Sequence, residues 1–95
     1  MITYPAVRQD LAFVVDETVT AGELVEAARE AAPEVREARF VSEYRGEQIG
    51  LGKKSVALAV AFQSPDRTLS NADAAELRGR VVRALAARFG AELRT

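Results

Sequence analysis

The 95-residue sequence contains no cysteine and no histidine. Without cysteine the chain can form no disulfide, thiolate zinc site or thiol nucleophile. Without histidine it can carry no Ser-His-Asp triad, no imidazole acid–base chemistry and few transition-metal sites. These absences remove the usual side chains of catalysis, so we expect a binding domain and no metal site.

Long apolar segments are also missing. No apolar run approaches the roughly 20 residues of a membrane-spanning helix. The N-terminal stretch Met1–Pro5 has no basic region followed by an apolar core, so no signal peptide is expected. With cysteine absent as well, the sequence predicts a cytoplasmic protein that does not contact a membrane.

Neither sign of charge is in excess. Thirteen Lys and Arg residues oppose 14 Asp and Glu residues, for a net charge of −1. This balance argues against a protein that coats nucleic acid by bulk electrostatics. Several cations instead gather around one predicted hairpin: Arg36, Arg39, Arg45, Lys53 and Lys54. A local basic patch on a near-neutral domain suits a partner that is bound mainly elsewhere.

Apolar residues make up 48% of the chain, which is enough for one globular domain over residues 1–95. Their alternation predicts strands over Asp10–Asp16, Val35–Arg45 and Ser55–Phe62, with a short final strand over Ala91–Arg94. In the second strand, Phe40 and Val41 point to opposite faces, so both cannot enter the core without a bulge. The sequence does not decide between them.

Helical spacing predicts two helices between these strands. Thr20 and Glu23 match a capping box that opens the first, and Pro33 ends it. Ser70 or Asn71 is expected to cap the second helix, and Gly90 to end it. The order βαββαβ predicts an α+β, ferredoxin-like two-layer sandwich. Its four-stranded antiparallel sheet has both helices on one face, and right-handed crossovers place the first and third strands in its centre.

The sheet face without helices is expected to be open and lined by many small side chains. Its residues by parity are Arg8, Asp10, Ala12, Val14, Ser55, Ala57, Ala59, Ala61, Glu92 and Arg94. Such a smooth floor would let a flat ligand lie close to the sheet. An ordinary alanine-rich surface would show the same composition.

The hairpin between the second and third strands is the most informative segment. It brings an aromatic ring, two lysines and a hydroxyl together: Tyr44, Lys53, Lys54 and Ser55. A cationic, aromatic surface of this kind suits a flexible polyanion. Five stretches then resemble a known family: Tyr4–Ala12, Tyr44–Gly46, Gly52–Ser55, Phe62–Leu69 and Arg88–Arg94. In order and spacing they resemble the ferredoxin-fold anticodon-binding domain, the C-terminal domain of the β subunit of bacterial phenylalanyl-tRNA synthetase.

The resemblance implies that the domain holds the anticodon stem and loop of tRNA(Phe), and it places the anticodon contacts on four residues. The Tyr44 ring would stack against an unpaired anticodon base, expected to be the first, a guanine. Ser55 would bond a base edge, and Ala12 would let a base approach the sheet. Arg94 would pair with phosphate or with a guanine edge. Lys53 and Lys54 are expected to contact phosphates.

The resemblance also implies the wider setting. The domain alone would be non-catalytic and carry no cofactor, whereas the parent ligase would use ATP and Mg. Its partners would be the remaining domains of the β subunit and the synthetase α subunit, and no DNA is expected. At 95 residues the chain is far shorter than a β subunit, so it is a domain cut from one or a free-standing relative. It departs from the family at Glu43, where relatives often carry an apolar or basic residue.

Other readings of the same fold explain less. A small-molecule regulatory domain, which would bind an amino acid, stays open as the alternative, although its expected Gly-rich turn is here Asp16–Thr20 and holds no glycine. An acyl-phosphate hydrolase would need an Arg after the first strand, where the residues are acidic. An RNA-recognition motif would need exposed aromatics on the third strand, where the sequence has Ser and Ala. Gly50–Ser55 does not match a phosphate loop, because a strand and not a helix follows it.

Overall fold

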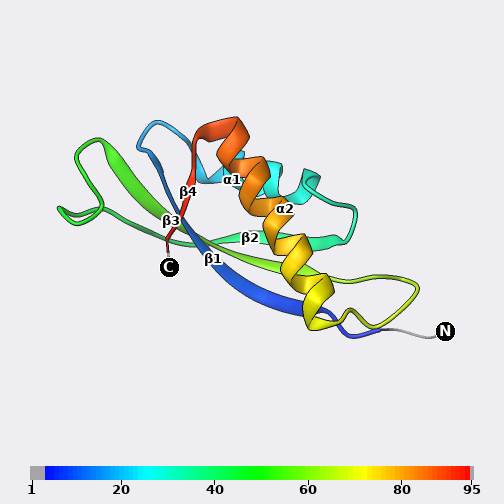
Figure 1. Cartoon of the computed structure of the whole chain (residues 1–95). Coiled ribbons are helices and arrows are strands. Elements are labelled where there is room, and N and C mark those ends of the chain that lie inside the picture. The colour runs from blue at the N-terminus through cyan, green and yellow to red at the C-terminus, as the bar shows by residue number, and fades with distance from the viewer. Residues whose placement is uncertain (1–3, 95) are drawn as a thin grey trace.

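The alternating apolar residues of the sequence form a twisted antiparallel sheet, and two helices cover one of its faces (Figure 1). The computed structural model describes residues 4–94. Its elements are β1 (Val7–Asp16), α1 (Ala21–Glu30), β2 (Val35–Tyr44), β3 (Lys53–Phe62), α2 (Asn71–Phe89) and β4 (Glu92–Arg94). The predicted βαββαβ order and ferredoxin-like fold are confirmed.

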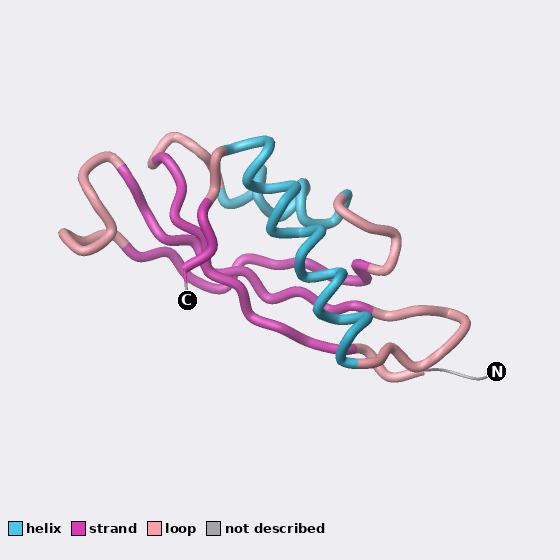
Figure 2. Tube along the Cα trace, viewed as in Figure 1, coloured by secondary structure: helices cyan, strands magenta, loops and turns pink. Residues whose placement is uncertain are grey.

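The strands lie in the order β2-β3-β1-β4, so β1 and β3 occupy the centre as predicted. All neighbouring strands are antiparallel. β4 pairs only with the segment from Ala12 to Val14 of β1, because it is three residues long. The tube in Figure 2 shows both helices on the same side of these strands. The opposite side of the sheet is left uncovered.

Both helices begin with capping boxes. In α1 the hydroxyl of Thr20 accepts a hydrogen bond from the backbone N–H of Glu23, and the Glu23 carboxylate accepts one from the N–H of Thr20. Ser70 and Asp73 exchange the same two hydrogen bonds at α2. Of the two predicted N-cap residues, Ser70 and Asn71, the structure therefore selects Ser70. Gly90 ends α2 in the left-handed conformation, at a φ of 66° that a glycine adopts without strain.

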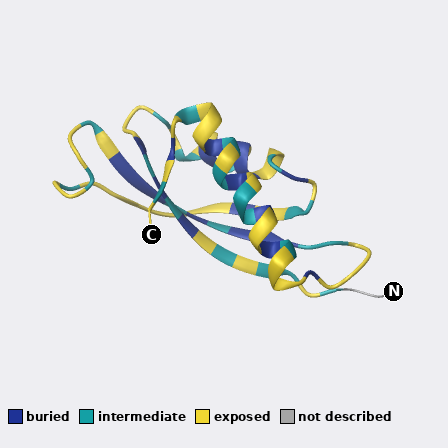
Figure 3. Ribbon diagram, in the orientation of Figure 1, coloured by how far each residue is buried: buried dark blue, intermediate teal, exposed yellow. Residues whose placement is uncertain are grey.

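The core lies between the sheet and the helices. Its fully buried large side chains come from both layers: Phe13, Val15, Leu24, Val56, Leu58, Val60, Phe62, Val81 and Leu85. Burial concentrates beneath the helices and decreases toward the β2–β3 hairpin, as Figure 3 shows. None of the helices within residues 4–94 is long and apolar enough to cross a membrane.

A bulge in β2 resolves the parity problem of Phe40 and Val41. The register shifts between Phe40, which lies opposite Leu58, and Ser42, which lies opposite Ala57. Phe40 faces the helix side but is 46% exposed, and Val41 is 47% exposed, so neither is a core residue. Because the bulge adds one residue to β2, the residues after it change faces, and Tyr44 lies on the open face of the sheet with Ser42.

The β2–β3 hairpin projects beyond the end of the helix layer (Figures 1 and 2). The molecule therefore measures 49 Å along its longest axis, against 21 and 19 Å across. In the connecting loop, Gly50 takes a φ of 113°, which side chains rarely tolerate. Leu51 beside it is fully exposed. The hairpin loop therefore lies beyond the helices, at one end of the open face.

Candidate nucleic-acid interface

The open face of the sheet has a floor of small side chains along β3. Ala59 lies between Asp10 of β1 and Arg39 of β2 in the strand register. Ala57, one pair of residues further along, is like Ala59 only partly exposed. The expected smooth floor is therefore present, with polar and charged side chains on either side of it.

Two pairs of side chains cross this floor, one toward each end. Arg8 and Glu37 form an ion pair of 3.3 Å, and both are register neighbours of Ala61, which is 2% exposed. At the hairpin end, the Arg94 guanidinium lies 5.7 Å from the centroid of the Tyr44 ring. The floor is therefore most open between the two pairs.

The Arg94–Tyr44 contact joins the two edge strands of the sheet. Because β1 and β3 separate them and strands lie about 4.8 Å apart, the two backbones are roughly 14 Å from each other. Both side chains must therefore extend over the face to meet. Ser55, the register partner of Tyr44, is 4% exposed. Ser55 is therefore buried in this structure although it lies on the open face by parity.

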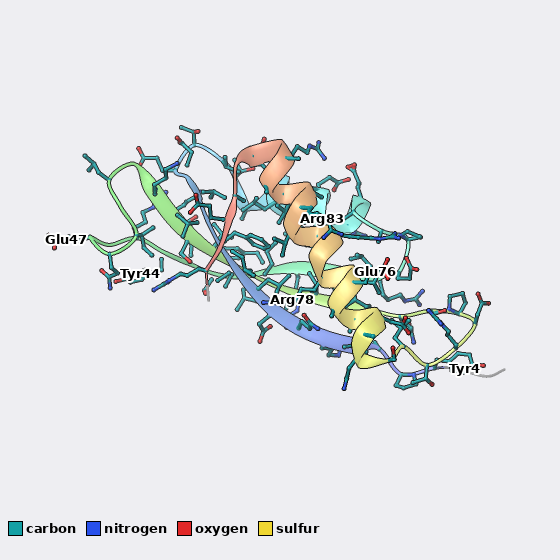
Figure 4. All side chains as sticks on the ribbon, in the orientation of Figure 1. Tyr4, Tyr44, Glu47, Glu76, Arg78 and Arg83 are labelled. Atoms are coloured by element: carbon teal, nitrogen blue, oxygen red, sulfur yellow. The ribbon has the colours of Figure 1, made fainter. Side chains whose placement is uncertain are left out.

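The structure brings the four predicted anticodon contacts together. Ala12 is opposite Arg94 in the register, and Tyr44 is opposite Ser55. The cation–π contact then joins these two pairs, and at an exposed position such a contact is worth about 0.5–1 kcal/mol. Figure 4 shows Tyr44 at the hairpin end, on the side of the sheet away from α2. This set of four residues is named the Tyr44 cluster below.

The two neighbouring lysines point to opposite faces, as β-strand parity requires. Lys53 is exposed and lies opposite Asp16 at the end of β1. Lys54 is on the helix side and is 5% exposed, and its ammonium Nζ lies 3.1 Å from Oε1 of Glu43. The charge of Lys53 is thus available at the surface, whereas that of Lys54 is already paired within the domain.

Glu43 lies on the opposite face from Tyr44, so its charge is not beside the Tyr44 cluster. The hydrogen bond from Lys54 holds the pKa of Glu43 below its usual value, with Arg45 adding to the effect. Arg45 also contacts Glu17 at 3.3 Å, beyond the end of β1. These ion pairs connect β2, β3 and the segment after β1. They give the carboxylate of Glu43, the residue before Tyr44, two cationic partners.

Sequence reasoning did not find the pairs that cross the floor. Arg8 and Glu37 are 29 residues apart, and their contact depends on how β2 pairs with β3. The register of that pairing shifts between Val35 and Glu37 and again between Phe40 and Ser42. The contact between Arg94 and Tyr44 requires the strand order and the twist of the sheet to be known. Parity alone placed Arg94 on the open face and left the face of Tyr44 undecided.

The turn between β1 and α1 is closed by its own hydrogen bonds. The backbone N–H and the hydroxyl of Thr18 both donate to Oδ1 of Asp16, at 3.0 and 2.9 Å. These hydrogen bonds lower the pKa of Asp16. Among residues 4–94, no group of three or more acidic side chains lies close enough together to hold a metal ion. Nothing at this turn favours a small-molecule regulatory site.

Comparison with known proteins identifies the family of this chain. A β subunit of phenylalanine–tRNA ligase from Bifidobacterium longum is 50% identical over 93 residues, which is 97% of this chain and 11% of that protein. The corresponding subunits of Vibrio cholerae and Geobacillus kaustophilus are 44% and 40% identical over 92 residues, 96% of this chain. The chain therefore spans only about a tenth of the length of these relatives.

The model of the ferredoxin-fold anticodon binding domain matches residues 3–94, almost the whole chain. The match agrees with the four-stranded sheet and its two helices on one face. The predicted resemblance is confirmed, and nothing in the comparisons favours the small-molecule alternative. The chain belongs to the ferredoxin-fold anticodon binding domain family.

Proposed function

We propose that this domain binds the anticodon stem-loop of tRNA(Phe) through the Tyr44 cluster, as part of the β subunit of a phenylalanine–tRNA ligase. The observation that carries the proposal is the assembly of Ala12, Tyr44, Ser55 and Arg94 on one open sheet face. Membership in an anticodon-binding family supports it, as do relatives that are β subunits of this ligase.

Each residue of the cluster has a role that its chemistry allows. The Tyr44 ring stacks on an unpaired anticodon base, which we infer to be the first, a guanine; such stacking is worth about 1–3 kcal/mol per base. When the base enters, Arg94 leaves the ring and pairs with a phosphate or a guanine edge. The hydroxyl of Ser55, the register partner of Tyr44, would hydrogen-bond the base edge once the side chains around it make room. The methyl group of Ala12 leaves room for the base above the sheet.

Phosphate contact is assigned to Lys53 and not to Lys54. Lys53 is exposed, whereas Lys54 is buried and paired with Glu43. Releasing Lys54 would break its 3.1 Å contact with Glu43 and bring a buried ammonium out of a position where it is already paired. Lys53 is exposed and can contact an RNA phosphate without leaving a buried contact.

The remaining partners follow from the parent protein. The other domains of the β subunit and the α subunit would supply the rest of the tRNA contacts, in the cytoplasm. ATP and Mg would be bound by those parts, and this domain would carry no cofactor. We expect the isolated domain to show neither aminoacylation nor ATP hydrolysis; turnover of either would overturn the assignment as a binding module.

The test is the affinity of the 95-residue domain for a labelled tRNA(Phe) anticodon stem-loop, measured by fluorescence anisotropy at low salt. The control is the same stem-loop with the first anticodon base replaced. Weak binding that weakens further for the altered loop supports the proposal. Equal binding to both loops would show that the domain does not distinguish the first anticodon base, and the proposed reading of that base would be wrong.

A further inference from the structure

Gly46 follows Tyr44 by two residues and has no conformational reason to be glycine. The positive-φ residues of the described chain are Gly50, Gly52 and Gly90, and Gly46 is not among them. Its backbone therefore has a φ that other residues can adopt. The reason for a glycine here must be the space around it.

That space is filled by the tyrosine. A Cβ atom added to Gly46 would lie 2.7 Å from the hydroxyl oxygen Oη of Tyr44 and 3.1 Å from its Cζ. It would also lie 3.1 Å from Oε1 of Gln48. A Cβ atom essentially never lies 2.7 Å from another heavy atom, so the tyrosine or the loop would have to move. The hydroxyl end of the ring thus lies directly against the backbone of the hairpin loop.

The same ring is in contact with Arg94, whose guanidinium is 5.7 Å from its centroid. The ring therefore has two neighbours: the hairpin loop at its hydroxyl end, and Arg94 of the other edge strand over the ring. Between these two contacts it occupies one place on the open face, opposite Ser55 in the register. When a base displaces Arg94, the loop at the hydroxyl end still positions the ring, so the base meets a surface already in place.

We propose that Gly46 is a positioning residue for Tyr44: the absence of its side chain fixes where the ring lies on the open face and hence how it receives a base. The inference rests on the proposed function for its consequence in RNA binding, but the placement of the ring can be tested without RNA. Gly46 itself makes no contact with a base in this proposal.

We expect Gly46→Ala to displace the Tyr44 ring without lowering the stability of the fold. The atoms that a Cβ at Gly46 would meet are the ends of the Tyr44 and Gln48 side chains, and Tyr44 is 45% exposed. Both side chains can swing into solvent, so the collision is relieved cheaply. Replacing a glycine at a compatible φ also restricts the unfolded chain, which stabilises a protein. Gly46→Ala should therefore keep or raise the melting temperature while it displaces the ring.

The experiment compares Gly46→Ala with Gly22→Ala. At Gly22 the nearest atom to an added Cβ is Oγ1 of Thr20, at 3.9 Å, so this control adds the same methyl group without a collision. In the free protein, NMR shifts of the Tyr44 ring protons and of the Arg94 side chain should change in Gly46→Ala and stay in place in Gly22→Ala. Affinity for the anticodon stem-loop should fall at least about fivefold in Gly46→Ala only, the weaker end of base–aromatic stacking.

A second variant checks the mechanism. In the double variant Gly46→Ala with Tyr44→Phe, the hydroxyl oxygen that lies closest to the new methyl group is gone. We expect the ring to return toward its place, so that stem-loop affinity recovers toward that of Tyr44→Phe alone. Unchanged ring shifts in Gly46→Ala would overturn the proposal. If the wild-type domain binds no stem-loop, the proposed function fails, and the ring shifts alone decide whether Gly46 positions Tyr44.

Discussion

Tyr44 and Phe40 give a matched test of the open face at the scale of single residues. They lie on the same strand and are 45% and 46% exposed, but the bulge at Val41 puts them on opposite faces. Similar exposure means that removal of either ring should cost similar stability. Only Tyr44 should matter for RNA.

We predict that Tyr44→Ala weakens stem-loop binding by roughly five- to 150-fold, the range that corresponds to about 1–3 kcal/mol of stacking. Its melting temperature should stay close to that of the wild type. Phe40→Ala, measured in the same anisotropy assay, should bind as the wild type does. A sharp loss of thermal stability in Tyr44→Ala would mean that the tyrosine belongs to the core.

The adjacent lysines give a second matched pair. Lys53 is exposed, and Lys54 is buried against Glu43. We predict that Lys53→Met weakens stem-loop binding and reduces the slope of log affinity against log salt concentration by about 0.7, the value for one phosphate contact on a single strand. Lys54→Met should lower the melting temperature and leave that slope unchanged. The reverse pattern would assign the phosphate contact to Lys54.

At the scale of elements, the helix starts follow from local sequence alone. Thr20 caps α1 through a reciprocal exchange with Glu23. Loss of such a cap costs about 1 kcal/mol. We predict that Thr20→Ala lowers the free energy of unfolding by this amount in urea titrations. Thr68→Ala is the control, because Thr68 is exposed and outside every helix and strand. An equal effect of the two substitutions would contradict the capping role.

Local patterns predicted the elements well because their causes are local. Capping boxes involve residues three positions apart, and the alternation in Val56–Phe62 reflects a central strand with one face beneath the helices. The four strands, their order and the open face shared by Ala12, Ser55 and Arg94 were therefore accessible from sequence, whereas the face of Tyr44 was not. The bulge beside Val41 was seen only as a conflict in parity, because its place depends on the pairing of β2 with β3.

Contacts across the sheet could not be predicted. The Arg94–Tyr44 contact joins strands that do not pair, and the burial of Lys54 depends on Glu43 of the neighbouring strand. Likewise, the sequence shows a glycine at position 46 but not which side chain fills the space beside it. Each of these features depends on side-chain conformation after the sheet has formed, and no periodicity encodes it.

At the scale of the whole molecule, the absence of histidine and cysteine removes the side chains that ordinarily titrate between pH 5 and 8. Four carboxylates have pKa values below their usual range: Asp16, Glu23, Glu43 and Asp73. Hydrogen bonds to the ionised form lower each of them; at Glu23 and Asp73 the caps Thr20 and Ser70 donate these bonds. The unfolded chain therefore binds protons more tightly than the folded one.

Folding stability should follow from this sign. The carboxylates contribute their full stabilisation above their unfolded pKa, about 4, and lose it as pH falls through the lower folded values. We predict a nearly constant free energy of unfolding from pH 6 to 8 and a steady decline below about pH 5, measured by urea denaturation across the range. A stability maximum near pH 4 would contradict these pKa directions.

The measurement to make first is NMR chemical-shift mapping of the domain titrated with the tRNA(Phe) anticodon stem-loop, beside a loop with the first anticodon base replaced. If the open face reads the anticodon, shifts will centre on Ala12, Tyr44, Ser55 and Arg94 and will weaken for the altered loop. Shifts confined to the helices, or none at near-millimolar RNA, would contradict recognition of the anticodon by this face of the sheet.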